Sequence, residues 1–248
     1  MPSVSLPDDA SLAQLRKQAK DVRDLARAGV PGALDLVAEY HPKGAHAVTL
    51  TGAQLVVARH NGFASWARLK QHLEMIERYR RSPDLVDQTS GAADEFLAFA
   101  CLRFGGDDEP SRWERAARVL ANHPELTRSS IYVAAAAVDE ESVRAQVAAD
   151  PALASREGGP YGWEPLLYLA SSRHDPGISE EATLGTARAL LEHGGDPNAG
   201  YLWHGLYPPY TVATCALGSH DEDEHPHAFA LAELLLTAGG RQRRAVAL

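Results

Sequence analysis

One stretch, residues 184–198, constrains the fold of this chain more than any other part of the sequence. It reads L-G-T-A-R-A-L-L-E-H-G-G-D-P-N. Leu184, Ala187, Leu190 and Leu191 fall on one face of a helix, which predicts an amphipathic helix packed on an apolar core. The glycine pair at 194–195 predicts the end of that helix, because glycine readily adopts the left-handed conformation found there. The following D-P-N predicts a tight turn.

A second short helix is predicted at 211–218, which reads T-V-A-T-C-A-L-G. Together the two segments resemble the ankyrin repeat, in which an outer helix ends in leucines, G-x-D-P-N follows, and T-P-L-x-x-A begins an inner helix. Residues 162–170, G-W-E-P-L-L-Y-L-A, are similar to the same inner-helix motif, with Glu164 in place of threonine. The resemblance implies an all-α, ankyrin-like helical solenoid.

Further helix pairs are expected on both sides of these motifs. Pro124 and Pro151 occupy equivalent positions 27 residues apart, and Pro197 follows 46 residues later. An ankyrin unit is about 33 residues long, so the later units carry insertions, which we expect to be enlarged loops. The predicted inner helices are 95–104, 131–138, 162–170 and 211–217, and the predicted outer helices are 111–120, 141–149, 180–193 and 226–238.

The first 83 residues form a separate region in this interpretation. Apolar periodicity predicts helices at about 8–28, 32–40, 51–60 and 65–80, with capping boxes at Ser11/Gln14 and Thr51/Gln54. The region resembles the short helical segment that precedes ankyrin repeats in many bacterial proteins, through L-R-K-Q-A-K-D, A-Q-L-V-V-A-R and G-F-A-S-W-A-R-L-K. A boundary is predicted at the R-R-S-P of residues 80–83. The expected domains are therefore an N-terminal helical region, 1–83, and degenerate ankyrin repeats, 84–248.

Charge is distributed unevenly between these two regions. Residues 1–83 carry 12 Lys and Arg against 8 acids, whereas residues 84–248 carry 12 Arg against 25 acids, a net charge of −13. An acidic surface repels phosphate backbones, which argues against nucleic acid binding. It favours a basic protein partner or a cationic ligand, although solubility alone also explains it.

The sequence also predicts where the protein resides. It has no apolar run long enough to span a membrane and no segment resembling a signal peptide at its N-terminus, so neither a membrane partner nor secretion is expected. Cys101 and Cys215 lie in apolar helical contexts, which indicates buried, reduced thiols in a cytoplasmic protein.

Aromatic residues are concentrated between 161 and 210, and they form the main candidate binding surface. Amphipathic rings suit binding because they bury area at little entropic cost, and beside acids they can hold a cation. The alternative is that the rings pack the two long insertions onto the helices. The candidate binding residues are Trp163, Glu164, Tyr168, Tyr201, Trp203, His204, Tyr207 and Tyr210.

A catalytic alternative depends on Glu164 and His204, with His174 and Asp175 nearby in the repeat. Glu164 precedes Pro165 at the start of an inner helix, where the helix dipole favours an ionised carboxylate. If His204 reached Glu164, the two could act as general base and acid. The simpler alternative is an exposed glutamate at the start of a helix and a loop histidine.

The loop 219–227 reads S-H-D-E-D-E-H-P-H, with three histidines and four acids. Its spacing matches no established metal-site pattern, so we expect a solvated loop and no bound metal. Motifs for nucleotide, serine-hydrolase, zinc-protease and redox chemistry are absent, and no cofactor is expected.

Two functions therefore remain open. The leading hypothesis, which the resemblance implies, is a cytoplasmic ankyrin-repeat module that binds a protein partner through its concave face and loop fingers. The alternative is a small-molecule-binding protein or enzyme with an aromatic and acidic pocket built from residues 161–210.

Overall fold

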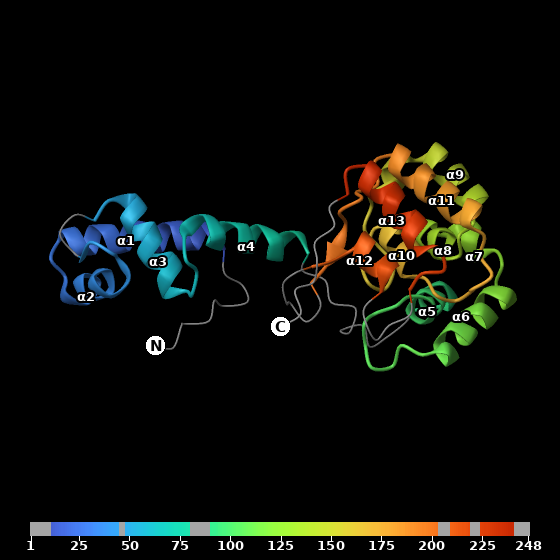
Figure 1. Cartoon of the computed structure of the whole chain (residues 1–248), viewed down its shortest axis with the longest axis horizontal. Coiled ribbons are helices and arrows are strands. Elements are labelled where there is room, and N and C mark those ends of the chain that lie inside the picture. The colour runs from blue at the N-terminus through green and yellow to red at the C-terminus, as the bar shows by residue number, and fades with distance from the viewer. Residues whose placement is uncertain (1–10, 45–47, 80–89, 203–208, 219–223, 241–248) are drawn as a thin grey trace. The chain divides into compact units, whose positions relative to one another are not determined.

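The computed structural model describes residues 11–44, 48–79, 90–202, 209–218 and 224–240 (Figure 1). The chain divides into two compact units, Met1–Arg78 and Tyr79–Leu248. The division falls just before the boundary predicted at 80–83, a segment that lies outside the described residues. Tyr79 belongs to the second unit, where its hydroxyl donates to the carbonyl of Asn198 at 2.9 Å.

The first unit consists of helices. They are α1 (Leu12–Arg27), α2 (Pro31–Tyr40), α3 (Leu50–His60) and α4 (Trp66–Arg78). The Ser11 hydroxyl accepts from the Gln14 amide at the start of α1, which is one of the two hydrogen bonds of the predicted capping box. At α3 the cap is Thr49, whose hydroxyl accepts from the Gly52 amide, so the box predicted at Thr51 was wrong by two residues.

Two apolar clusters hold the first unit together. One joins α1, α3 and α4 and includes Leu15, Ala19, Val57 and Leu69. The other joins α1, α2 and α3 through residues that include Val37 and Val56. Helix α1 contributes to both clusters because its buried residues recur along its whole length, as the three-four spacing of its apolar residues predicts.

The second unit is also mostly helical, as predicted from the apolar periodicity. Its longer helices lie close to the expected ranges, and the short helix α7 and the 3-10 helix η3 were not predicted. The helices are α5 (Ala92–Ala100), α6 (Pro110–Asn122), α7 (Leu126–Ser129), α8 (Ile131–Ala136), α9 (Glu140–Ala149), η3 (Pro151–Ala154), α10 (Pro165–Ser171), α11 (Glu180–Glu192), α12 (Val212–Leu217) and α13 (Ala228–Thr237).

Polar caps set the starts of several of these helices. Ser130, Asp139, Ser179 and Thr211 each accept a hydrogen bond from the amide three residues ahead, which satisfies one of the free N–H groups of the first turn.

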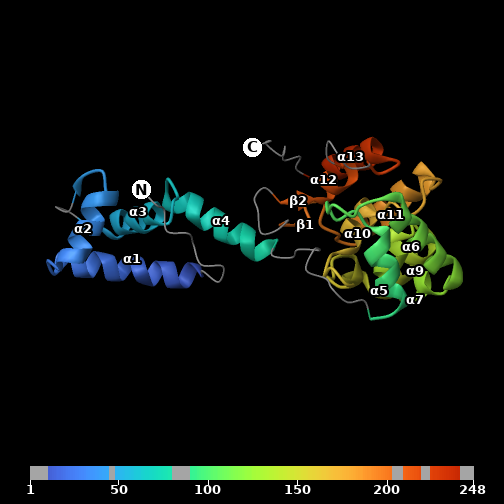
Figure 2. The ribbon, with the colours of Figure 1, turned by 90° about the horizontal axis from the view of Figure 1, so that it is seen from below.

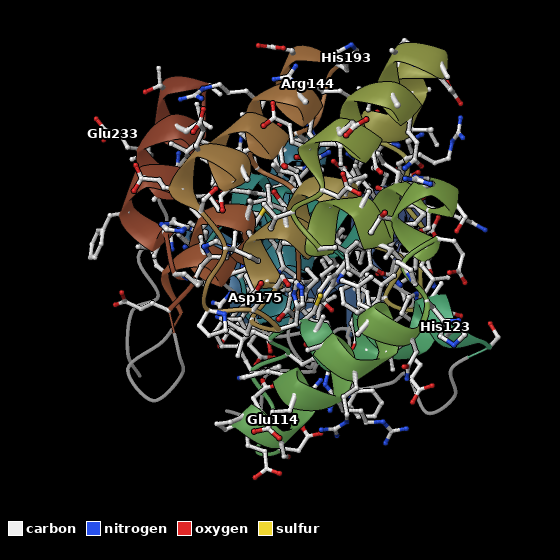
Figure 3. The ribbon with its side chains drawn as sticks, turned by 90° about the vertical axis from the view of Figure 1, so that its right-hand side faces the viewer. Glu114, His123, Arg144, Asp175, His193 and Glu233 are labelled. Carbon is white, nitrogen blue, oxygen red and sulfur yellow. The ribbon has the colours of Figure 1, made fainter. Side chains whose placement is uncertain are left out.

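These helices contact one another in chain order. The short helices α5, α8, α10 and α12 pack successively side by side, and so do the longer helices α9, α11 and α13. Within each consecutive pair, α5 contacts α6, α8 contacts α9, α10 contacts α11, and α12 contacts α13. Figure 3 shows α9, α11 and α13 as neighbouring parallel ribbons on one face of the unit. One apolar core runs through the whole set.

A short antiparallel hairpin lies between α11 and α12. Strands β1 (Gly200–Tyr201) and β2 (Tyr210–Thr211) pair with Gly200 opposite Thr211 and Tyr201 opposite Tyr210 (Figure 2). A Cβ atom on Gly200 would lie 2.4 Å from the carbonyl oxygen of Tyr210. Only glycine therefore allows this close approach of the two strands.

No helix among the described residues is long and apolar enough to cross a membrane.

The last helix, α13, has one buried face and one exposed face. Leu231 and Leu235 are fully buried, whereas Phe229 and Leu236 are 75% and 44% exposed.

We predict that Gly200→Ala destabilises the second unit by about 2 kcal/mol or more, because the new methyl group meets backbone atoms that cannot move independently. Gly106→Ala is the matched control, since a Cβ there meets nothing within 4 Å and Gly106 lacks a positive φ. Urea unfolding followed by circular dichroism measures both changes. Equal stability of the two variants would contradict the prediction.

Candidate functional site

The aromatic residues singled out in the sequence form part of the core. Trp163 is 1% exposed, and Tyr168 and Tyr201 are fully buried. The rings of Trp163 and Tyr201 stack with centroids 5.0 Å apart, and Tyr201 stacks in turn on the half-buried Tyr210 at 5.7 Å. These three buried rings offer no exposed surface to a partner, whereas Tyr210 is partly exposed.

The other aromatic candidates, Trp203 and Tyr207, lie outside the described residues, and so does the candidate general acid, His204. The pairing of Glu164 with His204 therefore stays a prediction. Glu164 is the N-cap residue of α10, but its side chain does not bond the helix it precedes. Its Oε2 atom instead accepts from the amide of Asp196 at 3.4 Å. This bond connects the start of α10 to the D-P-N turn that follows α11.

The hydroxyl groups of two core tyrosines have different surroundings. Tyr168 donates to the carbonyl of Gly158 at 2.9 Å and accepts from the amide of Tyr161 at 3.1 Å. The Tyr201 hydroxyl is buried and has no hydrogen-bond partner among the described residues. Burial raises the pKa of both groups well above the ordinary value for tyrosine. Neither hydroxyl is therefore an acid or base at neutral pH.

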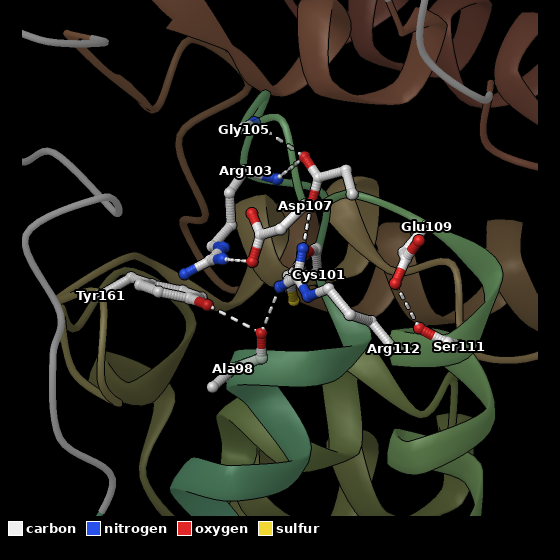
Figure 4. Close-up of polar contacts among 10 residues, drawn as sticks. Ala98, Cys101, Arg103, Gly105, Asp107, Glu109, Ser111, Arg112 and Tyr161 are labelled. Atoms are coloured by element: carbon white, nitrogen blue, oxygen red, sulfur yellow. Dashed lines mark hydrogen bonds and ion pairs between the residues drawn. The ribbon is translucent and has the colours of Figure 1, made fainter.

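The buried charged groups of the second unit gather elsewhere, where the connections between paired helices meet. Arg112 of α6 is 6% exposed, and its Nη2 atom donates to the carbonyls of Ala98 at 2.5 Å and Cys101 at 3.4 Å (Figure 4). Those carbonyls are at the C-terminal end of α5, where helix carbonyls lack partners within the helix and the dipole attracts a cation. Arg112 thus caps α5.

Asp108 holds Arg112 in this position and closes the loop between α5 and α6. Its Oδ1 atom forms an ion pair with Arg112, and the Asp108 side chain is 1% exposed. Its Oδ2 atom accepts from the amides of Arg103 at 2.9 Å and Gly105 at 3.0 Å. Both carboxylate oxygens are therefore satisfied, which a buried carboxylate requires. The neighbouring pair between Arg103 and Asp107 is more exposed.

Arg173, two residues after the end of α10, caps the C-terminal ends of two helices at once. Its guanidinium donates to the carbonyl of Ala170 at 3.0 Å and to that of Cys215 at 2.7 Å. These carbonyls belong to the last turns of α10 and α12. Arg173 is 5% exposed, so this cation joins the C-terminal ends of two neighbouring short helices.

Backbone hydrogen bonds complete this junction. The Leu102 amide donates to the carbonyl of Ser171, and the Arg173 amide donates to that of Ala100, both at 2.7 Å. The segment after α5 therefore runs antiparallel to the segment after α10, with Cys101 opposite Ser172. The first and third helix pairs therefore meet here.

A pocket of about 710 Å³ adjoins the junction. Its volume is within the range of small-ligand and peptide side-chain sites. Helix α6 forms one wall, the connection between α10 and α11 a second, and the segment before α13 a third. It is lined by Pro110, Trp113, Glu114, Ala117, Arg173, His174, Pro176, Glu224 and Pro226.

Two buried histidines stand at or beside the pocket. His174 is 8% exposed, packs edge-on against Phe96, and has its Nδ1 atom 2.9 Å from the Ser172 hydroxyl. His225 is 2% exposed and lies between the lining residues Glu224 and Pro226. Burial lowers the pKa of His174 to about 4 and that of His225 to about 3, in the second case with the help of Arg173. Both imidazoles are neutral at pH 7.

The burial of His225 corrects one expectation for residues 219–227. We expected a solvated loop, but its described part, 224–227, packs against the helices, with the His225 amide donating to the carbonyl of Ala216 at 2.9 Å. Within the described part of the chain, no three His, Cys, Asp or Glu side chains are grouped as metal ligands. Residues 219–223 are outside it.

Comparisons of the chain with protein-family models, curated proteins and solved structures found no match.

Sequence reasoning missed Arg112, Arg173 and Trp113 as important residues. A local signal existed for Arg173, because basic residues directly after an apolar helix often bond its last carbonyls. Arg112 gave no such signal, since it lies ten or more residues after the carbonyls that it caps.

We predict that Tyr168→Phe lowers the free energy of unfolding by about 1–2 kcal/mol, because it leaves a buried amide and a buried carbonyl without their partner. Tyr201→Phe removes a hydroxyl that has no partner, so we expect stability to stay the same or to rise. Urea unfolding of the two matched variants is the measurement. A larger loss for Tyr201→Phe than for Tyr168→Phe would refute this account of the core.

We also predict that Asp108→Ala costs about 3–5 kcal/mol of stability, because it leaves the Arg112 charge buried without its counterion. The control is Asp107→Ala, which breaks the exposed pair with Arg103 and is expected to cost less than about 1 kcal/mol. Thermal and urea unfolding distinguish the two. Similar losses in both variants would show that Asp108 does not hold the junction.

Proposed function

We propose that residues 79–248 are an ankyrin-like helical-repeat module that binds a protein partner. The chain-order packing of α5, α8, α10 and α12, and of α9, α11 and α13, supports this proposal. In this proposal the hairpin between α11 and α12 would correspond to an ankyrin finger. Both cysteines are buried free thiols, which suits a reducing compartment such as the cytoplasm.

We place the binding site at the pocket beside α6, which differs from the aromatic surface expected from the sequence. The pocket combines apolar walls from Trp113, Ala117 and three prolines with the exposed carboxylates of Glu114 and Glu224. Arg173 contributes little positive charge to a ligand, because its guanidinium donates to the negative ends of α10 and α12. This lining is the observation that carries the proposal.

The partner that fits this lining is a peptide segment with an apolar side chain next to lysine or arginine. The apolar side chain would fill the space beside Trp113, and the cation would meet Glu114 or Glu224. The net charge of −13 over residues 84–248 would increase the association rate of a basic partner. A small-molecule site within residues 161–210 has less support, because the side chains of Trp163, Tyr168 and Tyr201 are packed inside the core.

The test is selection of peptides from a random library on the purified full-length chain, followed by affinity measurement by fluorescence anisotropy. We expect selected peptides to be enriched in Lys or Arg beside an apolar residue. Glu114→Gln with Glu224→Gln should weaken binding about five- to thirtyfold, because exposed ion pairs contribute about 0.5–1 kcal/mol each and the double variant removes two. Ala117→Phe should abolish binding by filling the pocket.

Glu233→Gln is the matched control, because Glu233 is exposed on α13, away from the pocket lining (Figure 3). It removes the same charge and should leave the affinity unchanged at moderate salt. The proposal fails if no peptide is selected, or if the pocket variants bind as well as Glu233→Gln.

A further inference from the structure

The segment before α13 is attached to the rest of the second unit by histidine side chains. The Nε2 atom of His227 lies 2.6 Å from the carbonyl of Ile178, to which it donates. The Nδ1 atom of His225 accepts from the His227 amide at 3.0 Å. The first bond joins residues 224–227, one wall of the pocket, to residues 172–178, another wall. The second lies within residues 224–227 and fixes the backbone of His227, the residue whose side chain makes the first bond.

The hydrogen bond at His225 fixes how that ring can be protonated. Because Nδ1 accepts from a backbone N–H, the neutral ring carries its proton on Nε2, which is buried and has no partner in the described part of the chain. A second proton would have to be placed on Nδ1. There it would point at the N–H of His227, so the bond would be lost and two donors would face one another.

The groups around His225 oppose that second proton. Arg173, His174 and His227 all contribute positive or potentially positive charge. Among the described residues, Asp175 acts on His174 and Glu180 lies 3.7 Å from Nδ1 of His227. No described carboxylate, including the adjacent and exposed Glu224, raises the pKa of His225. A cation on His227 therefore has a carboxylate beside it, whereas a cation on His225 is beside Arg173.

We propose that His225 is an acid-sensitive latch, whose protonation detaches residues 224–227 from residues 172–178 and opens that wall of the pocket. Its consequence for partner binding, release at acidic pH, rests on the function proposed above. The latch itself does not, because the opening is a property of the chain alone.

The stability of the latch depends on pH because the pKa of His225 is lower in the closed state than in the open state. Burial lowers the pKa of His225 from the ordinary 6.5 to about 3, so the closed state binds fewer protons than the open state below pH 6.5. The latch is fully stable above pH 6.5 and loses stability as the pH falls toward 3. At pH 4.5, the open fraction should rise on the order of 100-fold over its value at pH 7.5.

Hydrogen–deuterium exchange of the full-length chain without any partner tests the latch. After correction for intrinsic exchange rates, amides of residues 225–231 should lose protection between pH 7 and 4.5, while those of α8 and α9 keep it. His225→Asn should remove most of this pH dependence, because its side-chain oxygen can accept from the His227 amide and does not titrate. His123→Asn, at an exposed histidine, should leave the pH dependence as in the unaltered chain.

Constant protection of residues 225–231 over this pH range would overturn the proposal, and so would an unchanged pH response in His225→Asn. If His225→Asn does not fold, NMR titration of the imidazole in the unaltered chain decides. Titration near pH 6.5 without a change in the amides of 225–231 would also refute the latch. Failure of peptide selection would leave the latch intact, and a failed latch would leave the binding site intact.

Discussion

The second unit depends on two buried guanidinium groups that satisfy the ends of its short helices. The last turns of α5, α10 and α12 contain the fully buried residues Ala100, Ser171 and Cys215, so their last carbonyls need donors from within the protein. Arg112 and Arg173 donate to these carbonyls from neighbouring segments, and Asp108 neutralises the first of the two. Without these donors, burying three helix ends at one junction would leave several polar groups unsatisfied, at about 1–3 kcal/mol each. The antiparallel contact between residues 100–102 and 171–173, and the pocket beside it, both depend on this junction.

The positions of the helices could be predicted from the sequence, because apolar spacing and capping residues are local signals. The helix predicted at 180–193 is seen as Glu180–Glu192, and the one predicted at 141–149 as Glu140–Ala149. Short elements such as α7 were missed, since four residues are too few for a periodic pattern. The helix predicted at 111–120 begins one residue earlier than expected. Glu109 is the N-cap residue and Pro110 begins the helix, a position where the fixed φ of proline suits the first helical turn.

The candidate site could not be predicted in the same way. An aromatic-rich segment in a sequence does not reveal whether its rings face solvent or one another, and Trp163 and Tyr201 are stacked inside the core. The pocket combines α6, residues 173–176 and residues 224–226, which are more than 100 residues apart at the extremes. Only the packing of the helix pairs brings them together. The burial of His225 was hidden for a similar reason, because its acidic and histidine-rich neighbours in sequence suggest an exposed loop.

The two cysteines have a practical consequence. Cys101 and Cys215 are fully buried, and burial raises the pKa of the Cys215 thiol to about 12 and that of Cys101 higher still. Maleimide reagents attack the accessible thiolate, so in the folded protein both native sulfur atoms are protected from labelling. Two cysteines introduced at exposed positions would therefore accept fluorophores or spin labels selectively, and the distance between them could be measured without first removing the native thiols.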